Sequence, residues 1–522
     1  MRRDLGDFQT PPELVAAVLE TLGPIGEQWP RVLEPTCGRG HFLAGLLAQG
    51  SPPREIHGVE IQPEHCLAAK AMLSERGETG SRVAIHCADL FQLDLGRDLD
   101  WQGGGPMLVV GNPPWVTAAA LTRLEAPTVA PRSNLKRLRG LEARTGSSNF
   151  DLAESIWLKL AIELADESPT IAMLCKTSVA RALLQFAHAE SLPLGDASIR
   201  RINAARWFGA SVDACLFRAT IASGDRAAPI PVYRGLGTAD DPVTVIAFER
   251  GRLIADYSAY RQWSFVEGIG PRDWRQGIKH DAAAIMELAV EPGTGRLQNG
   301  RGEVVDIETE YVYPMVKGAD LKRPAHEWSD RALIVTQRRI GEETSRIEAE
   351  APRLWAYLGA NGDRLDGRRS SIYRDRPRFA IFGVGSYSFA PYKLAISGLH
   401  KTPRFRVVGP RGGRPTMLDD TAYFLPCDSA AEAVALASLA NDPAALGFLA
   451  ASSFTDAKRP ITKALLQRLD LTAILGRADR AGLFNRATST IVDELQREPT
   501  AEMLKEIEHH YAGLERPEAA PA

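Results

Sequence analysis

The 522-residue chain lacks several features that would assign a protein to a common class. Its six cysteines are scattered without a Cys-x-x-Cys pair, so the sequence indicates neither a disulfide framework nor a zinc site, and we expect no metal. No apolar run approaches the roughly 20 residues that cross a bilayer, and the N-terminus has no signal-peptide core. We therefore expect a cytoplasmic protein without a membrane partner.

Two nucleotide-binding signatures are also missing. Residues 38–42 read Gly-x-Gly-x-Phe without the third glycine of the dinucleotide fingerprint, and no Gly-Lys-Ser/Thr phosphate loop follows a strand here. The net charge of −3 names no partner until its distribution is known. At this length the chain is expected to form two or three domains.

The most informative stretch that is present is Val109-Val110-Gly111-Asn112-Pro113-Pro114-Trp115. The continuous apolar run from Met107 to Val110 predicts a buried parallel strand, which the two prolines end. The residues after the strand form a stiff loop at its carboxyl end, where open α/β sheets bind their ligands. Asn112 offers an amide acceptor and Trp115 an aromatic face. Taken alone, the stretch is more typical of a proline-rich turn with a packed tryptophan than of a catalytic loop.

Three earlier strands also end in polar residues. Strands ending at Glu34, at Glu60 (26 residues later) and at Asp89 precede the strand that ends at Asn112. If the sheet is parallel, all four residues lie at one edge, where a doubly wound fold holds ribose hydroxyls on the acid after its second strand. The acids favour a ligand with a positive charge over a phosphate. The segment with Thr10 predicts a helix with Thr10 as its N-cap, whose start faces the same ligand.

The rest of the first domain continues the pattern of a doubly wound, mostly parallel α/β sheet. A helix is predicted over residues 152–164, and strands over 170–175, 198–203 and 214–221. Between the last two strands, Arg206-Trp207-Phe208-Gly209 forms a turn that either packs against the sheet edge or contributes to the site. Residues 116–148 read as a basic loop. We predict domains over 1–223, 242–470 (mixed α+β) and 471–522 (a helical region and tail), with a linker over 224–241.

Positive charge is concentrated in the second domain. Residues 364–414 contain twelve Lys and Arg against two Asp, with aromatic residues between them. Such a cluster indicates a polyanion partner, although a solvated arginine-rich face is the alternative. The role of residues 274–281 cannot be derived from their pattern. The candidate DNA-binding residues are Arg338, Arg339, Arg368, Arg369, Lys393, Lys401, Arg404, Arg406 and Arg411.

Together these motifs resemble one family, the S-adenosylmethionine-dependent DNA adenine-N6 methyltransferases of the gamma motif order. The order of Thr10-Pro11-Pro12, Glu34-Pro35-Thr36-Cys37-Gly38-Arg39-Gly40, Glu60, Asp89 and Asn112-Pro113-Pro114-Trp115 carries the resemblance, which is specific over residues 4–222. It implies a Rossmann-like catalytic domain, a C-terminal target-recognition domain, double-stranded DNA as substrate, and a bacterial or archaeal, nucleoid-associated protein. A tryptophan is less usual than Tyr or Phe at the last place of the motif.

The resemblance also implies roles for residues. Glu34 would border the amino-acid end of S-adenosylmethionine, Glu60 would bind the ribose and Asp89 the adenine of the cofactor. Asn112 and the Pro113 carbonyl would accept hydrogen bonds from the target amine, with Trp115 and Phe208 stacking on the flipped base and Pro114 completing the loop. The full set implied for the cofactor is Thr10, Pro11, Glu34, Pro35, Thr36, Cys37, Gly38, Gly40, Glu60, Ile61, Asp89, Leu90 and Asn112.

Other functions remain open at this point. Methyltransferases that act on a protein glutamine or on RNA share the Asn-Pro-Pro-aromatic loop, and a non-catalytic DNA-binding specificity module is a further alternative. We see no Asp…Glu-x-Lys nuclease cluster, so we expect modification without cleavage, in a restriction-modification or phage-defence system whose nuclease is a separate chain.

Overall fold

The structure is a computed structural model that describes residues 9–75, 80–116, 151–222, 228–237 and 241–515. Its internal contacts divide the chain into two compact units, Met1–Ser258 (unit 1) and Ala259–Ala522 (unit 2). Most of the predicted basic loop over 116–148 and of the tail lies outside the described residues.

Unit 1 is built on one ten-stranded sheet in the order β10-β9-β8-β6-β7-β5-β4-β1-β2-β3. The neighbouring strands from β3 to β5 are all parallel, and β7 runs antiparallel to both β5 and β6. The predicted α/β class with a mostly parallel sheet is therefore confirmed. The strands are β1 Arg31–Glu34, β2 Glu55–Glu60, β3 Arg82–Cys87, β4 Met107–Gly111, β5 Thr170–Lys176, β6 Leu194–Asn203, β7 Asp213–Ile221, β8 Ile230–Tyr233, β9 Thr244–Glu249 and β10 Arg252–Ile254.

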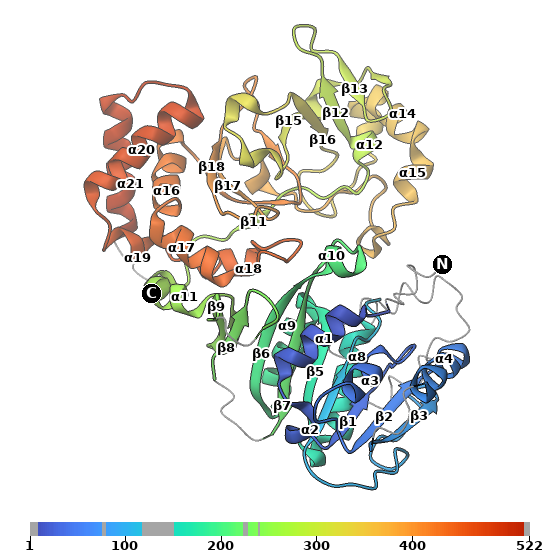
Figure 1. Cartoon of the computed structure of the whole chain (residues 1–522). Helices are drawn as coiled ribbons and strands as arrows, with labels where there is room; N and C mark the ends of the chain where they lie inside the picture. Colours follow the sequence, from blue (N-terminus) through green and yellow to red (C-terminus); the bar gives the residue numbers. More distant parts are fainter. Residues whose placement is uncertain (1–8, 76–79, 117–150, 223–227, 238–240, 516–522) are drawn as a thin grey trace, which may run out of the picture. The chain divides into compact units, whose positions relative to one another are not determined.

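Helices cover both faces of this sheet (Figure 1). Leu216 of β7 belongs to the same buried cluster as apolar side chains of α1 and α3, whereas its neighbour Phe217, on the opposite face, packs against Trp157 of α8. The central strands are buried along their whole length, which explains their continuous apolar sequences. The helices are α1 Pro12–Leu22, α2 Ile25–Gln28, α3 His41–Leu47, α4 Pro63–Ser74, α8 Leu152–Glu163, α9 Thr177–Glu190 and α10 Ala204–Phe208.

The division between the units differs from the predicted linker over 224–241. Residues 230–233 within that segment form β8, which pairs with β6 and β9, and the two units divide after Ser258. Pro231, one of the residues that suggested a linker, lies within β8. Within the predicted C-terminal region over 471–522, the helices α19, α20 and α21 pack on α16, and the region belongs to unit 2.

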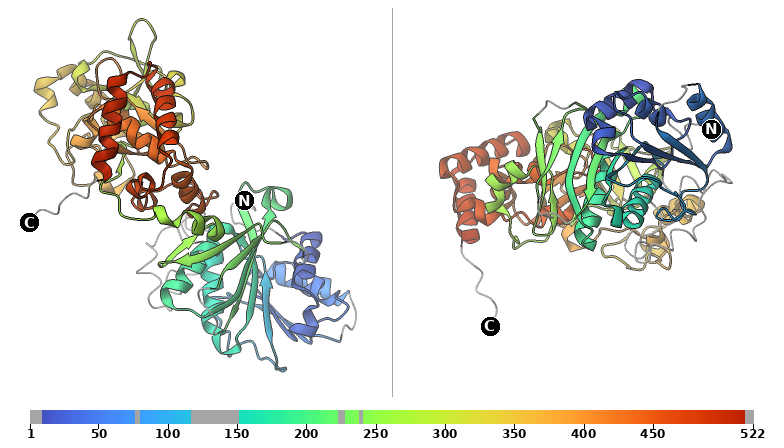
Figure 2. Two further views of the ribbon diagram at one scale, coloured as in Figure 1. Left: turned by 90° about the vertical axis from the view of Figure 1, so that its left-hand side faces the viewer. Right: turned by 60° about the horizontal axis from the view of Figure 1, so that its bottom comes forward.

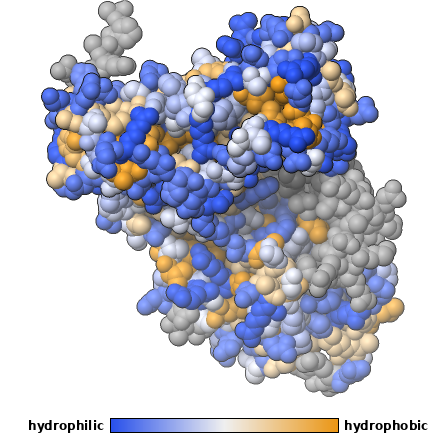
Figure 3. Space-filling view, turned by 90° about the horizontal axis from the view of Figure 1, so that it is seen from above, coloured by the Kyte–Doolittle hydropathy of each residue, from blue (hydrophilic) through white to orange (hydrophobic). Residues whose placement is uncertain are grey.

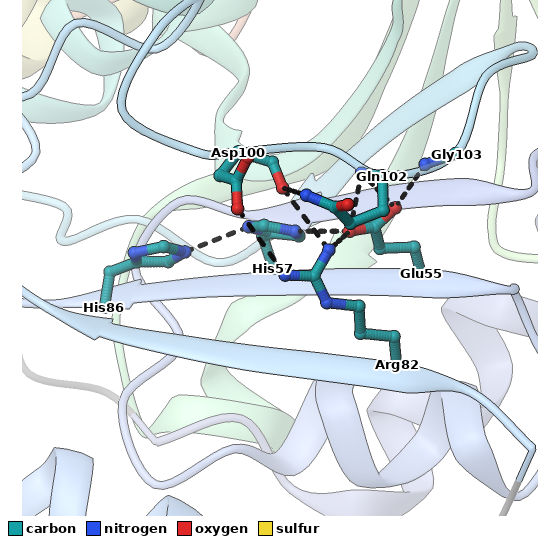
Figure 4. Close-up of polar contacts among 7 residues, drawn as sticks. All are labelled: Glu55, His57, Arg82, His86, Asp100, Gln102 and Gly103. Atoms are coloured by element: carbon teal, nitrogen blue, oxygen red, sulfur yellow. Dashed lines mark hydrogen bonds and ion pairs between the residues drawn. The ribbon is translucent and has the colours of Figure 1, made fainter.

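A polar network surrounds the buried Glu55 and His57 of β2, and Glu55 lies at the amino end of that strand, opposite to the edge where the carboxyl ends of β1–β4 lie (Figure 4). Glu55, the first residue of β2, is 3% exposed. Its carboxylate accepts hydrogen bonds from His57 Nε2, Arg82 and the backbone N–H groups of Gln102 and Gly103. Burial alone would raise the pKa of Glu55, but these hydrogen bonds lower it to about 2. The network ties the loop before β4 to β2 and β3.

The histidines of this network have fixed roles. His57 Nδ1 lies 2.9 Å from His86 Nε2, and the two rings stack with centroids 5.1 Å apart. Burial lowers the pKa of both histidines. A neutral His57 that donates from Nε2 to Glu55 must accept at Nδ1, so His86 donates to it.

Unit 2 combines two small sheets with a group of helices (Figure 2). A four-stranded sheet has the order β11-β20-β17-β18, and a six-stranded sheet the order β14-β13-β12-β16-β15-β19. The Ala- and Leu-rich α16 is apolar on all sides and accordingly buried, with α19, α20 and α21 packed around it. This arrangement confirms the predicted mixed α+β class of the second domain.

The elements of unit 2 are β11 Arg275–Gln276, β12 Glu287–Val290, β13 Leu297–Asn299, β14 Val304–Val305, β15 Val312–Val316, β16 Arg331–Ile334, β17 Tyr392–Ser397, β18 Phe405–Val408, β19 Met417–Leu418, β20 Ala422–Cys427, α12 Ala283–Met286, α13 Ile347–Glu350, α14 Pro352–Ala360, α15 Gly362–Asp366, α16 Ala430–Ala440, α17 Pro443–Ser452, α18 Lys463–Leu466, α19 Leu471–Leu475, α20 Arg480–Leu495 and α21 Ala501–Glu515, with α11 Tyr257–Trp263 at the division between the units.

Within the described ranges no single helix has the length and hydropathy of a membrane span; α16 and α17 reach that threshold only as a pair bent by 61°. Both helices contribute many side chains to the buried core of unit 2. The face of the molecule seen in Figure 3 is largely hydrophilic, with separate patches of hydrophobic residues.

Candidate functional site

Four polar strand ends meet at one edge of the unit 1 sheet. Strands β4, β1, β2 and β3 are adjacent and parallel, so their carboxyl ends point the same way. Glu34 and Glu60 are the last residues of β1 and β2, Asp89 follows β3 by two residues, and Asn112 directly follows β4. The sheet thus brings together the residues that the sequence pattern singled out.

Glu34 is the most deeply buried of these acids, at 2% exposure. Burial raises the pKa of its carboxyl well above the ordinary value of 4.5; a backbone hydrogen bond at Leu43 partly offsets this effect, and the charge of Glu60 adds to it. Among the described residues, Oε2 of Glu34 has no hydrogen-bond partner. A Cβ on Gly111 would lie 3.4 Å from Glu34 Cγ, so the start of the Asn112 loop lies against this acid.

The turn after β1 holds Glu60 in place. Gly38 and Gly40 have φ angles of +51° and +86°, which a residue with a Cβ rarely adopts. The turn directs the Gly38 N–H to Glu60 Oε2 at 2.9 Å, while the Gln62 N–H donates to Oε1 at 2.8 Å. A carboxylate has about four lone-pair positions, so Glu60 retains acceptor capacity for a ligand's hydroxyls.

Thr10 does not cap α1 as predicted. The helix begins at Pro12, with Pro11 at the N-cap and no side-chain capping bond. The Thr10 hydroxyl instead accepts a hydrogen bond of 3.1 Å from Asn112 Nδ2, and the Thr10 carbonyl lies 2.7 Å from His41 Nδ1. Because its NH2 group donates to Thr10, the Asn112 amide has Oδ1 as the atom that can accept from an amine.

Asp89 lies in a half-buried turn after β3. Its two oxygens accept hydrogen bonds from the Phe91 N–H at 2.9 Å and from Gln92 Nε2 at 3.1 Å. Leu90 is 5% exposed and Ile61, after β2, is 36% exposed. These neighbours therefore give the edge an apolar side beside its acids.

Trp115 and Phe208 form an aromatic corner at the end of β4. Their rings meet edge to face at 76° with centroids 5.1 Å apart, and Trp115 Nε1 donates to the Leu174 carbonyl at 3.3 Å. Phe208 ends the short helix α10, which Asn203 caps through the Arg206 N–H. Trp115 is only 6% exposed, so the half-buried Phe208 offers more surface to a ligand.

These residues fit S-adenosylmethionine, a ligand with a cationic amino group, ribose hydroxyls and an adenine amine. The buried Oε2 of Glu34 and Oγ1 of Thr36 have no hydrogen-bond partner among the described residues, and the acids supply only acceptors. The described residues contain no group of His, Cys, Asp or Glu suited to a metal ion. The other residues predicted at this edge are Pro35 and Cys37 (both buried) in the turn after β1, and Pro113 (buried) and Pro114 (half-buried) in the Asn112 loop.

Two features of the site escaped sequence reasoning. Gln9 Oε1 accepts the Arg39 N–H at 3.2 Å, so the segment before α1 lies over the glycine turn. Lys176, the last residue of β5, donates to Asp151 at 2.7 Å, and Asp151 also caps α8. Burial and then the charge of Asp151 raise the pKa of Glu154, one turn along α8, to about 7. The sequence could have identified Lys176, because it is another polar residue at the end of an apolar strand.

The basic residues of unit 2 separate into two groups. Arg338, Arg339, Arg369, Lys401 and Arg404 are exposed, as a DNA-binding residue must be. Arg411 is half-buried; it donates to the Ala325 carbonyl and lies over the ring of Trp328.

Three of the predicted DNA-binding residues are engaged within unit 2 instead, which corrects that prediction. Lys393 is 1% exposed and donates to the Ala390 carbonyl, and its burial lowers its pKa to about 8. Arg406 is 4% exposed and pairs with the buried carboxylate of Glu494. The Arg368 guanidinium donates to three backbone carbonyls and stacks 3.7 Å over a tyrosine ring.

The segment over 274–281 packs partly into unit 2. Trp274 and Ile278 are buried, and His280, at 6% exposure, lies 3.4 Å from Glu287 and accepts the Ala282 N–H. The hydrogen-bonded interpretation of this histidine therefore holds.

Comparison with known proteins places the chain among close relatives. It is 36% identical over 472 residues to Type II methyltransferase M.NspV of Nostoc sp., covering 90% of this chain and 97% of that protein. It is 31% identical over 134 residues to Type II methyltransferase M.CvrRI of Paramecium bursaria Chlorella virus XZ-6E, which covers 26% of this chain and 31% of the viral protein. No family model matches the chain.

Among solved structures, the Type IIL restriction-modification enzyme MmeI in complex with DNA superposes with a TM-score of 0.52 at 13% identity. The match covers 97% of this chain and 73% of that one. At this identity the likeness shows a shared fold over both units.

Proposed function

The chain belongs to the type II methyltransferases of restriction-modification systems, which use S-adenosylmethionine, and from this premise we propose that it methylates the N6 amino group of adenine in double-stranded DNA. The observation that carries the proposal is the Asn112–Thr10 hydrogen bond. It orients the side-chain amide of Asn112, directly after β4, beside the acidic edge, with the amide oxygen as the acceptor for an amine.

An aromatic amine is a poor nucleophile because its lone pair is delocalised into the ring. Asn112 Oδ1 and the Pro113 carbonyl would accept its two hydrogens, which draws the nitrogen toward a tetrahedral geometry and localises the lone pair. Orientation and fixed dipoles of this kind lower a barrier without a covalent intermediate. The rings of Pro113 and Pro114 lie on either side of the Pro113 carbonyl and keep it in place, since each ring restricts the backbone.

The acids of the edge would hold the cofactor. S-adenosylmethionine supplies a methyl group activated by a positively charged sulfur. Glu34 would receive its cationic amino group, Glu60 its ribose hydroxyls and Asp89 its adenine amine. Each of these carboxylates lies at the carboxyl end of a parallel strand, where doubly wound folds bind ligands.

The target amine is paired inside a duplex, so the base must leave the helix before transfer. Trp115 and Phe208 would receive it, because an edge-to-face pair leaves one ring face available for stacking. The accessible surface of the half-buried Phe208, next to the Asn112 loop, supports this assignment.

Unit 2 would recognise the DNA sequence through its exposed basic residues, which neutralise phosphates and set the register of the protein on DNA. We propose modification without cleavage, with any nuclease on a separate chain. Incubation of the purified protein with plasmid and magnesium tests this point, and site-specific cleavage would overturn it.

The main experiment uses Asn112→Ala with radiolabelled cofactor and duplex DNA, followed by digestion to nucleosides. We expect wild-type product to be N6-methyladenine and Asn112→Ala to lose roughly 10²–10³-fold in kcat, as when one transition-state acceptor or donor is removed. Cofactor affinity should change by less than a few-fold. Asn485→Ala, an exposed asparagine on α20, is the matched control and should retain full activity.

Three outcomes contradict the proposal. N4-methylcytosine as the product would reject adenine as the target. Label in RNA but not in DNA would reject DNA as the substrate. An equal collapse of cofactor binding in Asn112→Ala would show that Asn112 supports the fold rather than the reaction.

A further inference from the structure

A cavity of about 530 Å³ lies in unit 1 away from the acidic edge. It is lined by the C-terminal end of α1, the C-terminal part of α9 and residues on or next to β6, β7, β8 and β9. This volume is typical of pockets for small ligands, which range from about 300 to 1,000 Å³. None of the residues assigned above to the cofactor or the target base lines it.

Two arginines from neighbouring strands face this cavity. In the antiparallel β6–β7 pair, Ser198 is opposite Arg218 and Arg200 is opposite Leu216, so both arginines lie on one face as diagonal neighbours. That face is the one packed by α1, because Leu216 belongs to the α1 cluster. The Arg200 guanidinium lies 3.8 Å over the ring of Tyr233 on β8, which fixes its plane.

Each guanidinium has one buried donor atom without a hydrogen-bond partner in the part of the chain that the structure describes. Arg200 Nη1 and Arg218 Nε are shielded from solvent, and neither has a hydrogen-bond partner among the described residues. Buried polar groups in native proteins are almost always hydrogen-bonded, so each exception requires a reason. Asp196, the one acid among the described residues that line the cavity, is exposed.

The chemistry of the missing partner can be deduced from these donors. A guanidinium is always charged and its planar fork matches the oxygens of a phosphate. The Ser198 hydroxyl adds a neutral donor beside Arg218, and leucine, alanine and aromatic side chains line the remainder. We propose that this cavity binds a small phosphate monoester, with its phosphate between Arg200 and Arg218.

The cavity is separate from the place where DNA would react. Arg200 precedes Asn203, the cap of α10, by three residues, or roughly 10 Å along the strand. The arginines therefore lie along the sheet face rather than at its carboxyl edge. This position favours a small ligand over the backbone of the substrate duplex.

The test measures binding of inorganic phosphate and of ribose 5-phosphate by titration calorimetry to the full chain saturated with S-adenosylmethionine. Ionic strength is held constant with chloride. We expect saturable binding of both, tighter for the ester, and a loss of about tenfold or more in the double variant Arg200→Met/Arg218→Met, since both charge-assisted contacts are removed. Arg201→Met, an exposed arginine on the opposite face of β6, should bind within twofold of wild type.

Stability and a second variant separate a binding role from a structural one. Without phosphate, the double variant should unfold at the same or a higher temperature than wild type, because it loses donors that had no partner. Arg218→Lys keeps the charge but moves the donor, so it should also weaken phosphate binding. This single variant provides the test if the double variant does not fold. A lower unfolding temperature in phosphate-free buffer for both variants would assign the arginines to the fold.

The same titration with saturating duplex distinguishes the two sources of phosphate. Simultaneous binding of phosphate and duplex to one protein molecule would support the proposal. Displacement of phosphate by duplex, with weaker duplex binding in the double variant, would assign the arginines to DNA and overturn it. No saturable phosphate binding, or equal binding by Arg201→Met and the double variant, would also overturn it.

Discussion

The variant Glu34→Gln separates two effects of the buried Glu34 carboxyl, one on the stability of the fold and one on cofactor binding. In the protein without cofactor, Glu34 is 2% exposed and burial raises its pKa well above 4.5. An acid whose folded pKa is raised destabilises the folded state increasingly as pH rises from the unfolded pKa to the folded one, and by a constant amount above that. The neutral glutamine avoids this penalty, so we expect Glu34→Gln to leave stability at pH 8 unchanged or increased.

Cofactor binding should respond in the opposite direction. A hydrogen bond between charged groups contributes about 1.5–3 kcal/mol, so its loss should weaken S-adenosylmethionine binding by roughly 10- to 150-fold. For wild type, the cationic amino group favours ionised Glu34, so affinity should rise with pH up to the folded pKa, by at most about tenfold per pH unit. This pH dependence should disappear in Glu34→Gln.

Calorimetry in buffers of different ionisation enthalpy measures both the affinity and the protons released on binding. Glu20→Gln, an exposed acid on α1, is the control and should behave as wild type. Normal cofactor binding by Glu34→Gln, with the same pH dependence as wild type, would contradict a role in binding the cofactor. Strong destabilisation of the variant at every pH would show instead that Glu34 is a structural acceptor.

Three further predictions concern other parts of the chain. Phe208→Ala should lower kcat/KM for DNA by the loss of about 1–3 kcal/mol of base stacking, with Phe208→Tyr restoring it and 2-aminopurine fluorescence reporting the flipped base. Arg406→Met should lower the free energy of unfolding, measured with denaturant, by about 3–5 kcal/mol, because it leaves Glu494 buried without its partner. Lys401→Ala should instead weaken DNA binding and reduce the salt dependence of that binding, without changing the free energy of unfolding. The depressed pKa of about 2 at Glu55 contributes stability above pH 4.5 that is lost as pH falls toward 2, about 3 kcal/mol in all, and Glu55→Gln should flatten that dependence in urea unfolding.

The site at the strand ends could be predicted because local rules agree there. A continuous apolar run followed by a turn residue identifies each strand and its end, and parallel pairing then fixes which ends meet. The residues Glu34, Glu60 and Asn112 can be read directly from this pattern. The structure adds the pairing of Asn112 with Thr10, 102 positions earlier, which no local pattern contains.

Side-chain direction was the part that sequence could not supply. Counting charge over 364–414 treats every basic residue as exposed, but Lys393 and Arg406 lie on strands β17 and β18 that are buried on both faces. The partner of Arg406 is Glu494, 88 positions later on a helix. Likewise β8 was not predicted, because a run of four residues near prolines and glycines is too short to show the alternating pattern of a strand.

Four charged residues show how the hydrogen bonds that the protein itself supplies distinguish structural from ligand-binding side chains in this fold. Glu55 receives donors from two side chains and two backbone amides, and its low pKa records that the protein completes its environment. Glu34, on the adjacent strand at the opposite edge, is equally buried, yet one oxygen lacks a donor among the described residues and its pKa is raised. A buried charge without partners costs stability, so it persists only where something outside the chain completes it. We therefore propose that Glu34 faces the cationic end of the cofactor. With the sign reversed, we propose that Arg200 and Arg218, each with one donor atom that has no partner among the described residues, bind an anion.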